Sequence, residues 1–392
     1  MSRALDGSTV TDTPARLLAG GRVVAPEGVL ADAWVHVEGA TIVSVTRDRP
    51  AVGAAVFDLQ GAWLLPGFVD LHVHGGGGHD AVSSQEAMEN AVAFHRRHGT
   101  TATLVSLMTA PLDELSRQLA WVADLVRRGP TPRGHVLGAH LEGPFLSPRR
   151  AGAQDPAHML APDRAVLDRL VHAADGSLRI MTIAPELHGA LPLISRLRER
   201  DVIAALGHSD ANYEEAATAI RAGATHATHL FNGMPPLHHR APGLVGAALD
   251  ADISCELIND GPHLHPAVVS LVARAISSPV LVTDAIAACG AGDGTFVLAG
   301  QEVQVTDGEA RLTATGSLAG STLTMDEALR RAVRDGGLSV EQASAAASAH
   351  PARVLGLDGS LGSVAAERRA DLVALDDDLH VTRVMAAGEW CP

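Results

Sequence analysis

Five apolar, strand-like runs in this chain each end in histidine or acidic residues. They lie at residues 68–74, 138–144, 205–209, 226–230 and 281–285. Barrel enzymes carry their chemistry at the carboxyl ends of parallel strands, so we expect these side chains to meet at one end of a barrel. Imidazole and carboxylate groups together are typical ligands of divalent transition metals. The pattern therefore predicts a metal site inside a barrel and favours a hydrolytic enzyme over a binding module.

The middle of the chain alternates strand patterns with helix patterns. An eightfold alternation favours a (β/α)8 TIM-type barrel over an open doubly wound sheet. Residues 294–315 break the pattern with hairpin-like strands and are predicted to be an insertion, after which residues 325–335 return to helix. The predicted barrel strands are residues 67–73, 102–107, 136–141, 179–183, 202–206, 226–230, 253–258 and 279–283, and the predicted helices between them are residues 84–98, 111–128, 162–174, 191–200, 213–222 and 266–275.

Both ends of the chain are rich in short strand patterns separated by turns. Residues 15–61 contain several of them, and residues 370–375 and 381–384 look the same. Two similar ends around a different middle predict one small β-sandwich domain built from residues 1–63 and 350–392. The catalytic barrel is then predicted to span residues 64–349.

Composition limits the partners of the chain. It has 392 residues, 46% of them apolar, and a formal net charge of -15. Nucleic acids and anionic membranes require basic patches, so we expect neither as a partner. A small phosphorylated substrate needs only a local group of donors and stays possible. The sequence contains no lysine, which excludes a Schiff-base lysine, a P-loop lysine and a carbamylated lysine between two metals.

Cysteine usage and hydropathy predict a cytoplasmic protein. Cys255, Cys289 and Cys391 are scattered and odd in number, which suits a reducing compartment. Residues 1–16 are polar and show no signal peptide. No run reaches the roughly 18 apolar residues of a membrane span.

The predicted metal site draws on five residues. His72 and His74 lie on one face of a strand, because strand side chains alternate. Glu142, His208 and His229 each end an apolar run and would form a three-ligand site with an open position for water. His72 and His74 would complete a second site, with Glu142 bridging the two sites. The alternatives are a solvent-facing strand for His72 and His74, a salt bridge to an arginine for Glu142, and hydrogen-bonded core positions for His208 and His229.

Other polar residues extend the predicted site. Asp284 follows the last predicted strand and suits a general base opposite a metal, although a helix N-cap is the alternative. His140 is a competing ligand that alternation places one pleat deeper than Glu142. Residues 238–240 and 259–263 carry donors suited to a phosphate, and solvated loops are the alternative.

Six motifs together resemble the N-acetylglucosamine-6-phosphate deacetylases of the amidohydrolase superfamily. They run in order along almost the whole chain, from about residue 18 to residue 388. The pairing of Leu-Glu-Gly-Pro-Phe with Thr-His-Leu-Phe-Asn is the specific part, since a His-x-His motif is shared across the superfamily. The motifs occupy residues 140–145, 207–209, 228–234, 259–263, 282–285 and 317–321.

The resemblance implies a metal-dependent deacetylase. Glu142, His208 and His229 match its principal metal ligands, and His74 beside His72 allows a second ion. We expect one or two divalent transition metals, zinc first, with iron, manganese or cobalt as alternatives. The catalytic acid/base then corresponds to Asp284.

The resemblance also implies the substrate contacts. Asn232 and Gly233 match donors to the substrate phosphate, with His263 nearby, and Leu318 matches a residue near the acetyl group. Arg240 matches an arginine that reaches the phosphate in the neighbouring subunit, which implies a homodimer.

One position departs from the family pattern. Many members have a substrate-contacting histidine where this chain has Gln154, which can donate a hydrogen bond but carries no charge. The implied reaction is hydrolysis of N-acetylglucosamine 6-phosphate to glucosamine 6-phosphate and acetate, in amino-sugar catabolism and cell-wall recycling, with N-acetylgalactosamine 6-phosphate as the alternative substrate. A cyclic-amide hydrolase, a deaminase and a catalytically inactive binding barrel are the rival hypotheses.

Overall fold

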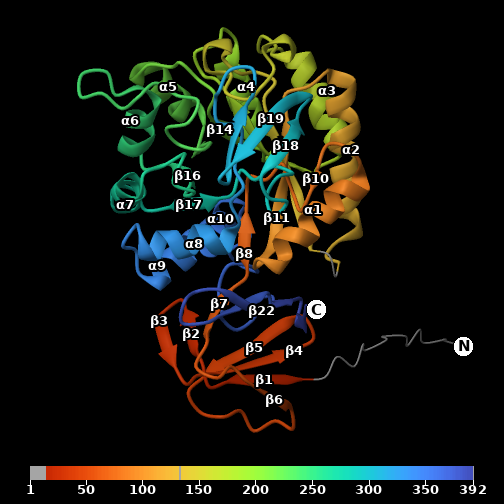
Figure 1. The fold of residues 1–392 in the computed structure, drawn as a ribbon, viewed down its shortest axis with the longest axis vertical. Coiled ribbons are helices and arrows are strands. Elements are labelled where there is room, and N and C mark those ends of the chain that lie inside the picture. Colours follow the sequence, from red (N-terminus) through yellow and green to blue (C-terminus); the bar gives the residue numbers. More distant parts are fainter. Residues whose placement is uncertain (1–14, 132–133, 392) are drawn as a thin grey trace, which may run out of the picture.

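The computed structural model describes residues 15–131 and 134–391. A large barrel unit and a smaller unit of β-sheets lie one above the other, and strand β8 leads from the small unit into the barrel (Figure 1). No helix among these described residues is long and apolar enough to cross a membrane.

The barrel is an eight-stranded parallel sheet in the order β17-β16-β15-β14-β13-β12-β11-β8. Its ends meet where Val73 bridges Ala285 in parallel and the Asp284 N–H donates to the His72 carbonyl at 2.8 Å. The predicted (β/α)8 barrel is therefore confirmed. The strands are β8 (Phe68–Asp70), β11 (Thr100–Met108), β12 (His135–Glu142), β13 (Leu178–Ile183), β14 (Ile203–Leu206), β15 (His226–Ala227), β16 (Ser254–Ile258) and β17 (Pro279–Val282).

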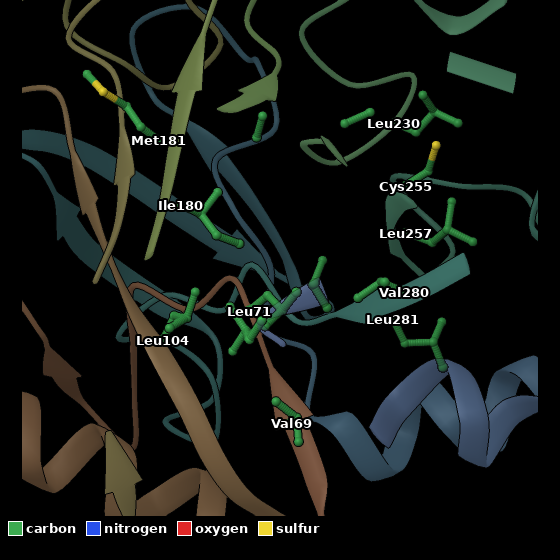
Figure 2. Close-up of a cluster of buried hydrophobic side chains, with 14 of the residues drawn as sticks. Val69, Leu71, Leu104, Ile180, Met181, Leu230, Cys255, Leu257, Val280 and Leu281 are labelled. Atoms are coloured by element: carbon green, nitrogen blue, oxygen red, sulfur yellow. The ribbon is translucent and has the colours of Figure 1, made fainter. Parts of the chain in front are cut away.

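Apolar side chains fill the barrel because parallel strands are covered on both faces. All nine residues of β11 are buried. Ile180 and Met181 point to opposite sides of β13, and Leu71, Leu104 and Leu281 lie among the buried side chains of the barrel (Figure 2). Polar groups at the strand ends therefore stand on a rigid apolar base.

The seven predicted helices are present close to their predicted ranges, and three further helices of the described residues, at 243–250, 340–344 and 350–354, were not predicted. Helix α6 was not predicted, since its two glycines and nearly unbroken apolar run give no polar stripe. Its neighbour α5 begins with a capping box between Asn212 and Glu215. The helices are α1 (Gln85–Arg97), α2 (Leu112–Arg128), α3 (Arg164–Ala174), α4 (Ala190–Arg198), α5 (Tyr213–Ala222), α6 (Gly243–Asp250), α7 (Pro266–Ala275), α8 (Met325–Arg334), α9 (Val340–Ser344) and α10 (His350–Val354).

The predicted insertion is a three-stranded antiparallel sheet, β18 (Gly294–Leu298), β19 (Gln301–Thr306) and β20 (Glu309–Leu312). Its inner face packs in one apolar cluster with Met108, the last residue of β11, and with Ile286, which lies in the segment that follows β17. This contact holds the insertion over the end of the barrel where β11 and β17 finish. A short hairpin of β9 (Gly75–Gly76) and β10 (His79–Asp80) follows β8.

Both chain ends build the smaller unit, as predicted. Its two sheets have the orders β5-β4-β1-β6 and β23-β22-β21-β7-β2-β3 and share a core that includes Val35, Leu64 and Leu372. The domain boundaries at residues 63 and 350 stay a prediction. The strands are β1 (Arg16–Ala19), β2 (Arg22–Ala25), β3 (Gly28–Ala31), β4 (Trp34–Glu38), β5 (Thr41–Thr46), β6 (Ala55–Asp58), β7 (Trp63–Pro66), β21 (Leu372–Leu375), β22 (Val381–Ala386) and β23 (Glu389–Trp390).

Candidate active site

Two triads of potential ligand atoms meet at the carboxyl end of the barrel. In the first, Glu142 Oε1 lies 2.9 Å from His208 Nε2 and 3.0 Å from His229 Nε2. In the second, His72 Nε2 and His74 Nε2 lie 3.1 Å apart. Glu142 is 3.7 and 3.5 Å from those two rings, so one carboxylate belongs to both triads. All five side chains are buried.

The hydrogen-bond partners assign the ring protons and show why these atoms suit a cation. His208 Nδ1 lies 2.8 Å from the Arg150 carbonyl oxygen, which can only accept, so the ring proton is on Nδ1. Its Nε2 lone pair then faces the Glu142 carboxylate. His72 Nδ1 likewise lies 2.9 Å from the Glu256 carboxylate, which turns the Nε2 lone pair of His72 toward the second triad. Electron pairs that converge in a buried space fit a metal ion.

Without a metal, the negative charge of the site holds a second proton on His72, at the nitrogen that a metal ion would occupy. Burial lowers the pKa of His72, but the surrounding carboxylates, led by Asp284 and Glu256, outweigh it and raise this pKa to about 10. Burial alone would raise the pKa of Glu142, yet the nearby imidazoles of His208 and His72 hold it well below its usual range. Negative charge thus dominates the site and favours a bound cation.

Asp284 stands beside the second triad. Its Oδ1 lies 3.1 Å from His74 Nε2 and 3.4 Å from His72 Nε2. Burial raises the pKa of Asp284, but the charge of His72 and the hydrogen bond from His74 outweigh it and lower this pKa. The carboxylate is therefore ionised and able to accept a proton.

Three of these side chains leave their strands through an uncommon backbone conformation. The φ angles of His208, His229 and Asp284 are 45°, 27° and 48°, in the left-handed region. Such conformations are strained in non-glycine residues and concentrate at functional sites. Here the left-handed conformation changes the direction of the backbone just after each strand ends.

His140 takes no part in either triad. Its Nδ1 is 3.0 Å from Ser106 Oγ and its Nε2 is 2.8 Å from Thr182 Oγ1. Burial lowers the pKa of this ring to about 3, so it is neutral. Both nitrogens are occupied, which removes His140 as a competing ligand in this arrangement.

Comparison with known proteins agrees with the geometry. Residues 63–391 match the Amidohydrolase family. The chain belongs to this family. It is 39% identical to N-acetylgalactosamine-6-phosphate deacetylase of Escherichia coli O157:H7, over 95% of this chain and 98% of the relative. It is 36% identical to N-acetylglucosamine-6-phosphate deacetylase of Bos taurus, over 96% and 94%.

A solved structure extends the similarity to the fold. N-acetyl-D-glucosamine-6-phosphate deacetylase from Mycobacterium smegmatis, as a mutant in complex with N-acetyl-D-glucosamine-6-phosphate, superposes with a TM-score of 0.91 at 39% identity. The match covers 96% of this chain and 99% of that chain. The predicted resemblance to this group of amidohydrolases is confirmed. The family is metal-dependent, in agreement with the ligand triads.

The amidohydrolase site opens into a pocket of about 230 Å³. The structure brings nearly all predicted substrate residues to its wall, together with Leu298 of the insertion and Ser317, which follows the insertion. Arg240 is the exception, because it is exposed and lines a separate recess with Asp210 and Tyr213. The predicted residues in the wall are Gln154, Asn232, Gly233, His263 and Leu318, beside His74, Glu142, His208, His229 and Asp284.

Gln154 lies in this wall but its amide is already engaged. The Thr109 N–H donates to Gln154 Oε1 at 2.9 Å, which fixes the orientation of the amide. Its Nε2 then donates to Glu142 Oε2 at 2.5 Å. The side chain therefore holds the shared carboxylate of the amidohydrolase site.

Glu256 belongs to the site but was not among the residues predicted from the sequence. It lies in the middle of β16, is fully buried and contacts His72, His226 and the backbone of His229. The available signal was a lone carboxylate inside the apolar run of residues 253–258, where an unpaired charge is costly.

Proposed function

We propose that this amidohydrolase removes the acetyl group from N-acetylglucosamine 6-phosphate, giving glucosamine 6-phosphate and acetate. The observation that carries the proposal is the buried pair of ligand triads with an ionised aspartate beside them, at the base of a pocket of about 230 Å³. Relatives of nearly full length that are named as deacetylases of amino-sugar 6-phosphates support it. We place the enzyme in the cytoplasm, where its three free cysteines suit a reducing environment.

Asp284 moves the proton in this reaction. Its carboxylate accepts a proton from the attacking water as the new C–O bond forms at the acetyl carbon. It then returns that proton to the sugar nitrogen as the C–N bond breaks, so one group serves as base and then as acid. The contact with His74 at 3.1 Å keeps the carboxylate oriented toward the reacting atoms.

The metal ligands are proposed to be Glu142, His208 and His229, with His72 and His74 available for a second ion. Nitrogen and oxygen ligands of this kind suit zinc, and iron, manganese or cobalt are the alternatives. A divalent ion in this position would polarise the acetyl carbonyl and make water a stronger acid.

The phosphate is proposed to bind near Asn232, Gly233 and His263. The His263 Nδ1 is engaged by Asp260 at 2.7 Å, which leaves Nε2 for a ligand. Gly233 has a φ of 61°, and an added Cβ would approach His208 Nδ1 to 3.2 Å. Only glycine therefore suits this position, where the backbone can come close to a ligand. Leu318 lies in the same wall, on the side proposed to face the acetyl group.

Arg240 completes the proposed phosphate site from a second subunit. It is exposed and does not line the pocket of its own chain, so a homodimer is the arrangement that gives it a role. Guanidinium groups bind phosphate through two parallel hydrogen bonds.

The galactosamine epimer is the second candidate substrate, because a relative at 39% identity is named for it. Acetate release from both 6-phosphates by the zinc-loaded enzyme tests the proposal, with unphosphorylated N-acetylglucosamine as the control. We expect kcat/KM to be highest for N-acetylglucosamine 6-phosphate. A higher value for the other epimer would change the substrate, and no acetate from either would overturn the proposed reaction.

A further inference from the structure

A fully buried carboxylate lies behind both ligand triads and outside the pocket. Glu256 is at the centre of β16, between the apolar residues Cys255 and Leu257, and its exposed fraction is 0%. An ionised carboxylate at such a depth is costly unless hydrogen bonds or cations compensate it. The contacts of Glu256 supply that compensation.

Each oxygen of Glu256 is engaged. Oε2 lies 2.9 Å from His72 Nδ1 and 3.0 Å from the backbone nitrogen of His229. Oε1 lies 3.0 Å from His226 Nε2. Of these partners, His72 belongs to one triad and His229 to the other, so a single carboxylate reaches both.

The contact with His72 determines which ring nitrogen carries the proton. A carboxylate can only accept, so a proton stays on Nδ1, and Nε2, which lies 3.1 Å from His74 Nε2, is the nitrogen left for a metal. With the proton on Nε2, His72 could not bind a metal through that atom. Carboxylate partners of this kind generally raise the affinity of a histidine for its metal.

The contact with His229 acts on the backbone instead. The φ of 27° at this residue is strained, and the hydrogen bond from its N–H to Glu256 helps to hold it. The same residue directs Nε2 to within 3.0 Å of Glu142 Oε1. Loss of the hydrogen bond would let the ring move away from the first triad.

We propose that Glu256 is a positioning residue that sets the proton of His72 and the backbone of His229, and thereby adjusts both ligand triads at once. It does not line the pocket. The inference rests on the proposed function only in that a metal binds to the triads.

Zinc affinity of the metal-free protein, measured by competition with a chromophoric chelator, tests the proposal. Glu256→Leu keeps a similar volume and removes both acceptors, so zinc should bind about ten- to a hundredfold more weakly. Glu256→Gln should recover part of that loss. Its carbonyl oxygen can accept from His72 and His229, while its NH2 group turns to His226, whose Nδ1 has no partner and can take the proton.

Asp70→Asn is the matched control. Asp70 is equally buried and accepts from the backbone of His72 and from Thr283, but it touches no ring nitrogen. This variant should have a lower melting temperature than wild type and a zinc affinity within about twofold of that of wild type. Loss of zinc binding in Asp70→Asn equal to that in Glu256→Leu would overturn the positioning role in favour of a general packing effect.

The remaining outcomes separate the two proposals. Zinc binding within about twofold of wild type in folded Glu256→Leu would overturn the inference and leave the proposed function intact. A wild-type protein that binds no zinc, iron, manganese or cobalt would overturn both. If Glu256→Leu does not fold, nitrogen-15 NMR of zinc-loaded wild-type protein decides. A His72 proton on Nδ1 supports the proposal, and a proton on Nε2 overturns it.

Discussion

The two ligand triads share Glu142 but hold it differently. His208 and His229 approach its Oε1 to 2.9 and 3.0 Å, whereas His72 and His74 stay 3.7 and 3.5 Å away. Asp284 lies on the looser side. The compact triad of Glu142, His208 and His229 has the arrangement of a complete ligand set. The looser triad of His72, His74 and Glu142 combines ligand atoms with Asp284, the group that moves protons. We therefore expect the first to determine metal retention and the second to determine the rate.

The largest effect is expected from Glu142→Ala, which removes the residue common to both triads. Metal content should fall to near zero, and activity should fall by at least about a thousandfold, because a bound ion contributes several kcal/mol to catalysis. Elemental analysis and acetate release measure the two losses. Glu186→Ala is the control, since Glu186 bonds Ser209 and Asp210 but no ligand atom. Full metal content in Glu142→Ala would disprove the shared-ligand assignment.

Asp284→Asn should separate chemistry from metal binding. The amide keeps the shape of the side chain but cannot accept the proton of water, so turnover should fall by about a hundred- to ten-thousandfold. Metal content should remain close to that of wild type. A variant that loses its metal would show that Asp284 is a ligand first, and a near-normal rate would remove it from the proton transfer.

The contrast between the triads can be tested by comparing His208→Ala with His74→Ala. The first should lose most of its metal, because it opens the compact triad. The second should keep an ion but lose the charge-assisted contact with Asp284, with a rate lower by about ten- to a hundredfold. Equal metal loss in both variants would mean that the two triads form one inseparable site.

Arg240→Ala should weaken substrate binding without changing the metal. Loss of a charge-assisted phosphate contact costs about 1.5–3 kcal/mol, so KM for the phosphorylated sugar should rise about ten- to a hundredfold. Turnover of the unphosphorylated sugar should barely change.

Subunit exchange locates this arginine. A mixture of Arg240→Ala and Asp284→Asn chains rebuilds one site with both residues intact, if each site takes its arginine from the partner. Activity should then exceed the sum of the two parents. No increase, with exchange verified by native mass spectrometry, would assign Arg240 to its own chain or to no substrate.

Much of this architecture could be predicted because it follows from local sequence. Apolar runs predicted the eight barrel strands, and helical periodicity predicted most of the helices between them. The alternation of strand side chains placed His72 and His74 together. Helix α6 lacked a polar stripe and so left no signal. Predicting the Glu256 contacts would have required placing β16 beside the neighbouring end of β15 and near the end of β8, which is far away in the sequence, and no local pattern describes the second of these.

Substitution of Gln154 should have the smallest effect on zinc binding, and it tests most directly how the two triads share Glu142. Its amide bonds Glu142 Oε2, the oxygen that faces His74, and leaves Oε1 to His208 and His229. Gln154→Leu removes both hydrogen bonds of this amide, to Glu142 and from the Thr109 N–H. The bond to Glu142 is the one that acts on the ligands, and at about 0.5–1.5 kcal/mol its loss should lower the zinc affinity of the compact triad about two- to tenfold.

The same substitution should also favour a second ion. Without the amide, Oε2 is free to turn toward His72 and His74, so zinc stoichiometry in Gln154→Leu should rise relative to wild type. Gln301→Leu is the control, because Gln301 donates to the neighbouring Ala153 carbonyl and touches no ligand. Stoichiometry that is unchanged in Gln154→Leu would show that the looser triad is limited by its own spacing and not by the amide that holds the shared carboxylate.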